Sequence, residues 1–220
     1  MITIAIDTEL KERLPNLILG GFLASVIVDK SDELLTAMIT NEVKELQQGL
    51  TPELIREMPH VKDNKDAYRR LGKDPNRYRP SSESLLRRIA SGKDLYAINN
   101  VVDILNLSSI KSGYSICGYD FDSIQGNISM GIAQADEPYE GIGRGELNIE
   151  CLPVFRDEKG AFGTPTSDSV RTQVKLETTR FLMIIIGFDN AANINLMLDE
   201  TIELLSRYAQ GKVAERFSIE

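Results

Sequence analysis

The order of helical and strand-like patterns along the chain constrains its fold more than any other feature. Apolar residues recur at helical spacing over much of the first 112 residues, whereas glycines and short alternating segments dominate 115–162. The apolar run 181–188 is too short to cross a bilayer and is typical of a buried central strand. An amphipathic helix is predicted next, over 191–210. Helices gathered before strands favour an α+β fold over regular βαβ winding.

Capping residues and glycines predict where the elements begin and end. Thr51 followed by Pro52 is typical of a helix start, and Gly72 is typical of a helix end. We expect Ser81 or Ser82 to cap the helix that follows the proline-containing basic loop. The predicted strands cover 2–6, 17–28, 180–188 and 213–219. The predicted helices cover 32–48, 61–71, 81–91, 99–112 and 191–210, with a further short helix that begins at Thr51 and Pro52.

Length and composition fit one globular unit. A chain of 220 residues with 42% hydrophobic and 26% charged residues can bury a full core, and it contains no repeat of fixed period. We expect a single domain over 1–220. Its expected parts are an N-terminal α/β lobe to about residue 60, a core over about 60–188, and a C-terminal helix and strand over 189–220.

Positive charge is concentrated in one segment of an acidic chain. The formal net charge is −8, which argues against non-specific affinity for polyphosphate. Residues 62–93 nevertheless hold ten basic and four acidic side chains. This segment is either a solvated helical face or a patch that contacts phosphates. On the predicted helix 81–91, Arg87 and Arg88 lie opposite the apolar residues, so we expect both to point away from the core.

The inventory of reactive side chains excludes several classes of enzyme. His60 is the single histidine, so a Ser-His-Asp or Cys-His arrangement would have to use it, and a surface or capping role is the better interpretation. Cys117 and Cys151 belong to no CxxC pair, so neither a zinc site nor a disulfide framework is predicted. The acidic residues near 120 and 136 match no calcium loop. We therefore expect no metal and no cofactor.

Two further sequence features bear on ligands and location. The stretch EGIGRGE over 140–146 lacks both the GxxxxGK[ST] and the GxGxxG patterns, so a tight β-turn is predicted there instead of a phosphate loop. The N-terminal segment has no secretory signal, and no segment is long enough to span a membrane. A cytoplasmic protein is expected.

Three stretches together carry a resemblance to a known family. They are residues 67–113, which include INNVVDILN, residues 115–133, which include GYDFDSI, and residues 162–186, which include TSDSVRT. In this order they resemble the tRNA-editing domain, or B3/B4 domain, of the phenylalanyl-tRNA synthetase beta subunit, in a free-standing form. The resemblance implies an α+β fold with a β-sandwich-like core flanked by helices. It also implies a tRNA or aminoacyl-tRNA partner, with no membrane and no DNA.

The activity implied by the resemblance is hydrolysis of a mischarged aminoacyl-tRNA, which in that family is tyrosine on phenylalanine tRNA. The pocket positions the ester and a water, so little is required of side chains. Candidate RNA-binding residues are the arginines of the basic segment, which offer forked donors to phosphates: Arg69, Arg70, Arg77, Arg79, Arg87 and Arg88. Candidate pocket residues are Asn99, Asn100, Asp103, Asn106, Cys117, Asp168, Ser169, Arg171 and Thr172.

Some of these candidates have a structural alternative. The stripe of Asn99, Asp103 and Asn106 either lines a polar cleft or braces a helix against a loop. Asp168 and Arg171 either form an internal salt bridge or belong to a turn that holds a ribose or an α-amino group.

Two positions depart from the family pattern. Bacterial members carry a histidine where this chain has Cys117, and a glutamate that binds the tyrosine hydroxyl where this chain has Ile184. Because isoleucine accepts no hydrogen bond, the resemblance at Ile184 indicates either a more apolar amino acid or no editing. Three functions therefore stay open: a trans-acting deacylase, a non-catalytic tRNA-binding module, and a small-molecule or amino-acid-binding protein.

Overall fold

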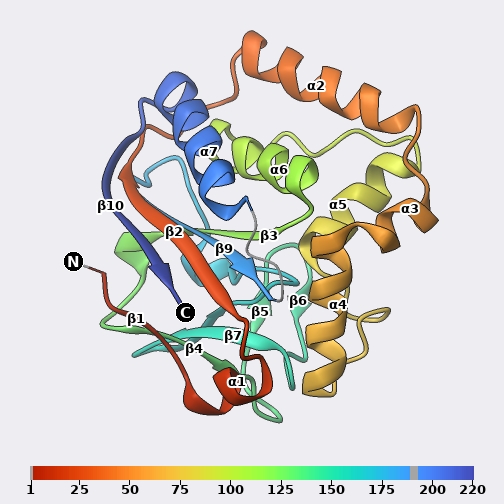
Figure 1. The fold of residues 1–220 in the computed structure, drawn as a ribbon. Coiled ribbons are helices and arrows are strands. Elements are labelled where there is room, and N and C mark those ends of the chain that lie inside the picture. Colours follow the sequence, from red (N-terminus) through yellow and green to blue (C-terminus); the bar gives the residue numbers. More distant parts are fainter. Residues whose placement is uncertain (1, 189–192) are drawn as a thin grey trace.

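Two four-stranded sheets and seven α-helices make up the part of the chain that the computed structural model describes, residues 2–188 and 193–220 (Figure 1). The first sheet has the order β1 (Ile4–Ile6), β4 (Ile128–Ile132), β7 (Pro153–Asp157) and β8 (Gly160–Gly163). The second has the order β10 (Lys212–Ile219), β2 (Ile18–Ser25), β9 (Arg180–Gly187) and β3 (Ser115–Asp120). Within these sheets β1 runs parallel to β4, and the other pairs are antiparallel.

Strand β9 shows why the two sheets and the helices stack as layers. It lies between β2 and β3, and its residues 181–188 are fully or almost fully buried. Alternate side chains point to opposite faces of a strand. Met183 packs in the cluster that includes Ile104 of α6 (Asn100–Ser112) and Leu198 of α7 (Ile194–Tyr208), whereas Ile184 packs in the cluster with Phe155 of the first sheet. The prediction of a central strand in an α+β, sandwich-like core is confirmed.

A third apolar cluster joins α6 to four further helices: α2 (Glu33–Gln47), α3 (Pro52–Glu57), α4 (Pro59–Leu71) and α5 (Ser81–Ala90) (Figure 1). Two of the predicted helix caps are confirmed here, at the start of α3 and at the end of α4. The Thr51 hydroxyl accepts a hydrogen bond from the Leu54 N–H, and Gly72 ends α4 in the left-handed conformation at φ 91°. The predicted serine cap of α5 is wrong, because Pro80 occupies the capping position and Ser82 is buried.

Other departures from the predicted elements are local. The short helix α1 (Thr8–Arg13) and the 3-10 turns η1 (Phe121–Ser123) and η2 (Val170–Thr172) were not predicted. The EGIGRGE stretch forms the expected tight hairpin, with β5 (Glu140–Gly141) and β6 (Gly145–Glu146). Residues 191 and 192 of the predicted last helix lie outside the described residues. None of the helices in the described part of the chain has both the length and the apolar surface that a membrane span needs.

Candidate functional site

A line of buried polar groups runs along one face of β3. Ser115, Cys117 and Tyr119 alternate onto this face, and all three are buried. The Asn64 side-chain amide of α4 donates to the Ser115 hydroxyl at 3.0 Å, and the Cys117 thiol lies 3.8 Å from the Thr164 carbonyl oxygen. Asp168 lies at the end of this line, where its Oδ2 accepts a hydrogen bond from the Gly118 N–H at 3.3 Å. We call this line, from Asn64 to Asp168, the β3 seam.

The segment after β8 places Asp168 against β3. The Thr164 hydroxyl donates to the Ser167 carbonyl oxygen at 2.9 Å and accepts from the Ser167 N–H at 3.1 Å, which closes a tight turn. Gly163 and Asp168 then pair across that turn as an antiparallel bridge. A side chain at position 163 would collide with the Tyr119 hydroxyl, so only glycine lets the turn approach β3 this closely.

Asp168 is the group of the seam that titrates near neutral pH. Its Oδ1 is buried and has no hydrogen-bond partner among the described residues. Loss of solvation raises the pKa of Asp168 to about 7, even though Tyr119, the Gly118 N–H and Cys117 each act to lower it. Burial, and then the nearby Asp168 charge, raise the pKa of both Cys117 and Tyr119. Both therefore stay protonated at neutral pH, and Cys117 is not a thiolate nucleophile.

Unpartnered buried polar atoms gather at this place in the molecule. Besides Asp168 Oδ1, they include the Tyr119 hydroxyl and Asn64 Oδ1. These atoms have no hydrogen-bond partner within residues 2–188 and 193–220. Because nearly all buried polar groups in proteins are hydrogen-bonded, such a concentration calls for a ligand or ordered water. The β3 seam is therefore the candidate site.

The β5–β6 hairpin lies over the Asp168 end of the seam and borders an open groove. The Ile142 N–H donates to the Asp168 carbonyl oxygen at 2.9 Å, and the Tyr139 hydroxyl donates to the Ser167 carbonyl oxygen at 2.6 Å. The groove has a volume of about 1010 Å³, and its walls come from the hairpin, β8 and η2. Its charged lining residues are four acids, Asp136, Glu137, Glu140 and Glu146, and two cations, Lys159 and Arg171. The groove is thus better suited to a cation than to a phosphate.

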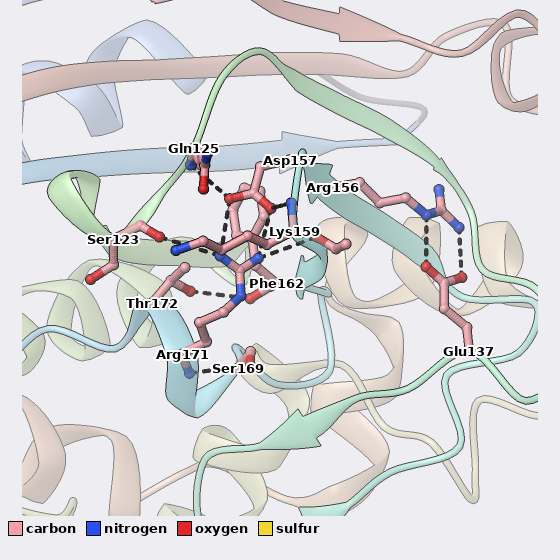
Figure 2. A network of polar contacts seen from close by, with 11 residues as sticks. Ser123, Gln125, Glu137, Arg156, Asp157, Lys159, Phe162, Ser169, Arg171 and Thr172 are labelled. Carbon is pink, nitrogen blue, oxygen red and sulfur yellow. Dashed lines mark hydrogen bonds and ion pairs between the residues drawn. The ribbon is translucent and has the colours of Figure 1, made fainter.

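Arg171, a predicted pocket residue, is held by a different acid from the one expected. Figure 2 shows its guanidinium group against Asp157, with contacts of 2.8 and 3.0 Å to the two carboxylate oxygens. Desolvation opposes ionisation of Asp157, but hydrogen bonds from Arg171 and two backbone N–H groups lower its pKa. Of the two alternatives for Asp168 and Arg171, the internal salt bridge is therefore wrong. Asp157 was missed because it lies 14 residues away, on β7.

The other predicted residues of this turn shape its backbone. The Ser169 hydroxyl accepts from the Arg171 N–H at 3.3 Å, and the Thr172 hydroxyl donates to the Phe162 carbonyl oxygen at 3.3 Å (Figure 2). The same view shows Arg156 paired with Glu137, at 2.7 Å, on the wall of the groove. Among these residues Ser169 and Arg171 line the groove, and Thr172 is buried.

The polar stripe of α6 braces the helix. Asn99 caps it by accepting from the Val102 N–H at 2.9 Å, and Asn100 donates to the carbonyl oxygens of residues 27 and 208. Asp103 accepts from the Ser31 hydroxyl at 2.6 Å and from the Ile98 N–H at 2.9 Å. With Asp103, Asn106 lines a cavity of about 90 Å³ between α2 and residues 94–97. Asn99 and Asp103 therefore brace the helix, Asp103 and Asn106 line this cavity, and none of these contacts is with a residue of the β3 seam.

Several arginines of the basic segment are held by other parts of the protein. Arg87 donates to the fully buried Glu83 at 2.7 Å, and Lys65 lies 3.5 Å from the same carboxylate. The expectation that Arg87 points away from the core is therefore wrong. Arg88 donates to the Asp94 carbonyl oxygen at 2.6 Å and stacks 3.7 Å above the Tyr96 ring.

The remaining arginines of that segment are exposed. Arg69 pairs with Asp66, and Arg70 also has an interaction partner. Arg77 and Arg79 are exposed on the loop before α5. They are thus the arginines of this set whose guanidinium groups are best presented to a phosphate.

Two further residues change the sequence interpretation. His60 is half-buried and stacks on Tyr114 with ring centroids 3.6 Å apart, so the expected surface or capping role is wrong. Tyr119 was not among the predicted site residues, although it lies two positions from Cys117 on the same strand face. The alternation of a strand that carries Cys117 was the signal that would have found it.

Comparisons with known proteins agree with this fold. The B3/4 domain family matches residues 63–209, which is more than half of the chain. Among solved structures, an N-terminal fragment of the phenylalanyl-tRNA synthetase beta subunit from Pyrococcus horikoshii is similar over 100% of this chain, with a TM-score of 0.51 and 13% sequence identity. The chain spans about half of that fragment, 54% of its length. A search of curated proteins found no match. The chain belongs to the B3/4 domain family.

Proposed function

We propose that this chain binds the aminoacylated 3′ end of a tRNA in the β3 seam and hydrolyses the ester bond in trans. The observation that carries the proposal is the set of unpartnered buried polar atoms around Asp168, in a chain of the B3/4 domain family. The related synthetase fragment comes from a protein that charges tRNA, and this likeness supports the choice of ligand. Water adds to the ester carbonyl carbon, and the ribose oxygen leaves with a proton.

The seam offers the donor that such a reaction needs. The Tyr119 hydroxyl is buried, stays protonated and has no hydrogen-bond partner among the described residues. We assign it to the ester carbonyl oxygen, where negative charge develops during attack by water. A preorganised donor at that position typically contributes about 10²–10³ in kcat. No nucleophilic side chain is required, because positioning of the ester and the water supplies much of the rate factor.

The loop before α5 is the proposed contact for the tRNA backbone. Lys73 anchors it by donating to the carbonyl oxygens of Asn148, at 3.0 Å, and Glu150, at 2.6 Å. At the other end of the loop, the Ser81 N–H donates to the Pro165 carbonyl oxygen at 2.7 Å. These bonds hold the exposed Arg77 and Arg79 next to the segment that carries Asp168. Guanidinium groups there are suited to phosphates near the acceptor end.

Release of amino acid from a panel of separately charged tRNAs tests the hydrolase. Tyr119→Phe should lower turnover by about 10²-fold, because it removes the proposed donor to the ester carbonyl oxygen. Absence of release from every charged tRNA would refute hydrolysis. Binding without turnover would then identify the non-catalytic module instead.

Salt-dependent binding tests the tRNA contact. The double variant Arg77→Gln, Arg79→Gln should reduce the slope of log K against log salt by about 1.5, since each phosphate contact contributes about 0.7–0.9. Arg13→Gln is the matched control, because Arg13 is an exposed arginine on α1 that pairs with Glu9. A slope unchanged by the double variant would remove the loop from the interface.

A further inference from the structure

Within the described part of the chain, the buried carboxyl group of Asp168 has no cationic side chain beside it. Arg171, which follows it closely in sequence, pairs with Asp157. The groups that face Asp168 are the Cys117 thiol and Tyr119 hydroxyl from β3, the Gly118 N–H, and the Tyr139 hydroxyl from the segment before β5. All of these are neutral. A buried carboxylate normally requires a cation or several hydrogen bonds, so this site is incomplete without one.

We propose that Asp168 binds the α-ammonium group of the ligand, so that the site accepts aminoacyl compounds with a free primary amine and rejects N-acylated or amine-free ones. The proposal rests on the proposed function in that the ligand is an aminoacyl compound. It specifies the chemical class of that ligand, and it does not depend on whether the ester is hydrolysed.

The acceptors around Asp168 match the three donors of an ammonium group. Asp168 Oδ1 has no partner among residues 2–188 and 193–220, and the Tyr119 oxygen is adjacent to it. The Thr164 carbonyl oxygen meets the weak thiol donor of Cys117. The acidic groove beside the hairpin adds a negative potential that favours approach of a cation. An N-acyl group would remove the charge and two of the donors while adding bulk. It would leave the carboxyl group unpaired.

Binding of an ammonium group should also release protons from the protein. The cation stabilises the ionised carboxylate, so a fraction of protein molecules that carry a proton on Asp168 near pH 7 must release it on binding. An amine-free ligand of the same shape gives no such release. Glu33, at the start of α2, is exposed and does not line the groove, so it provides a control acid of the same charge.

The test uses the whole chain and non-hydrolysable ligands. Primary amides of the twenty amino acids are titrated at pH 7 by calorimetry in two buffers of different ionisation enthalpy. The best binder is then compared with its N-acetyl and des-amino forms. We expect the modified forms to bind at least tenfold more weakly, and the free amine to release protons. Asp168→Asn should abolish both differences, whereas Glu33→Gln should retain them.

Three results would overturn the inference: no amide binds, the amine-free form binds as tightly, or Asp168→Asn keeps the amine preference. None of them bears on hydrolysis of charged tRNA, which is scored separately. Amine-dependent binding without deacylation would leave the inference standing and refute the proposed hydrolase. Deacylation that tolerates N-acetylated aminoacyl-tRNA would do the reverse.

Discussion

Asp168→Asn should make the protein more stable at alkaline pH. The pKa of Asp168 rises from an ordinary value of 3.8 to about 7 on folding, because burial removes the solvation of the charged form. Between these two values the folded state holds a proton that the unfolded state has lost. The free energy of unfolding therefore falls as pH rises from about 4 to 7, and it levels off above that. The contribution of Asp168 is most favourable at acid pH.

The size of this effect follows from the same shift. Each pH unit between the two pKa values lowers the free energy of unfolding by about 1.4 kcal/mol, so ionisation of the buried Asp168 lowers it by about 4 kcal/mol in all. Water that reaches the site reduces this figure. From pH 5 to pH 8 we expect the free energy of unfolding of wild type to fall by about 2–3 kcal/mol relative to that of Asp168→Asn. The asparagine oxygen can still accept from the Gly118 N–H, so the substitution removes chiefly the ionisable group.

Urea unfolding of both proteins at pH 5 and pH 8 measures this difference. Asp157→Asn is the control. Arg171 keeps the pKa of Asp157 below its ordinary value, so its contribution is constant over this range and is lost only as pH falls through that lower pKa. Parallel stability profiles of wild type and Asp168→Asn between pH 5 and pH 8 would refute the reasoning.

Three further substitutions test individual contacts. Glu83→Gln leaves Lys65 and Arg87 without their buried carboxylate and should lower the free energy of unfolding by about 3 kcal/mol. Asp66→Asn, in an exposed pair with Arg69, should change it by less than about 0.5 kcal/mol. Urea titration measures both. Arg171→Gln leaves the buried Asp157 carboxylate without its cation and should lower the free energy of unfolding by about 3 kcal/mol at pH 7. Part of this stability should return near pH 4, where the carboxylate takes up a proton, and the same titration at two pH values checks this. Gly163→Ala forces the Tyr119 ring aside and should cost about 1–3 kcal/mol, with partial relief when combined with Tyr119→Phe; an additive double variant would contradict the assigned collision.

The parts of the fold that depend on local pattern could be predicted from the sequence. Residues 181–188 are apolar on both sides, and they form the central strand β9 that both neighbouring layers bury. Thr51 and Gly72 act through their own backbone neighbours, so their caps needed no tertiary information. The short helix α1 is only six residues long, and its one buried side chain, Leu10, gives no periodic signal.

Pairing between distant side chains could not be predicted in this way. Arg87 lies opposite the apolar face of its helix by spacing, yet the buried Glu83 one turn earlier and Lys65 on a different helix draw it inward. Asp168 and Arg171 are near neighbours in sequence, but the guanidinium group reaches across to β7. Tyr119 could be recognised as a candidate site residue only once the turn at Gly163 was seen to pack against β3. Such information is in the packing and not in residue spacing.

The distribution of cations changes how an acidic protein would hold a tRNA. Lys65 and Arg87 share Glu83, Lys73 donates to backbone carbonyl groups, and Arg69 and Arg88 bind near neighbours. The exposed Arg77 and Arg79 then supply about two phosphate contacts, a modest attraction on a chain of net charge −8. Under the proposed function, discrimination would then come mainly from the aminoacyl end in the β3 seam. A domain that holds RNA weakly and the aminoacyl group specifically would favour charged over uncharged tRNA, and it would release the tRNA once the ester is broken.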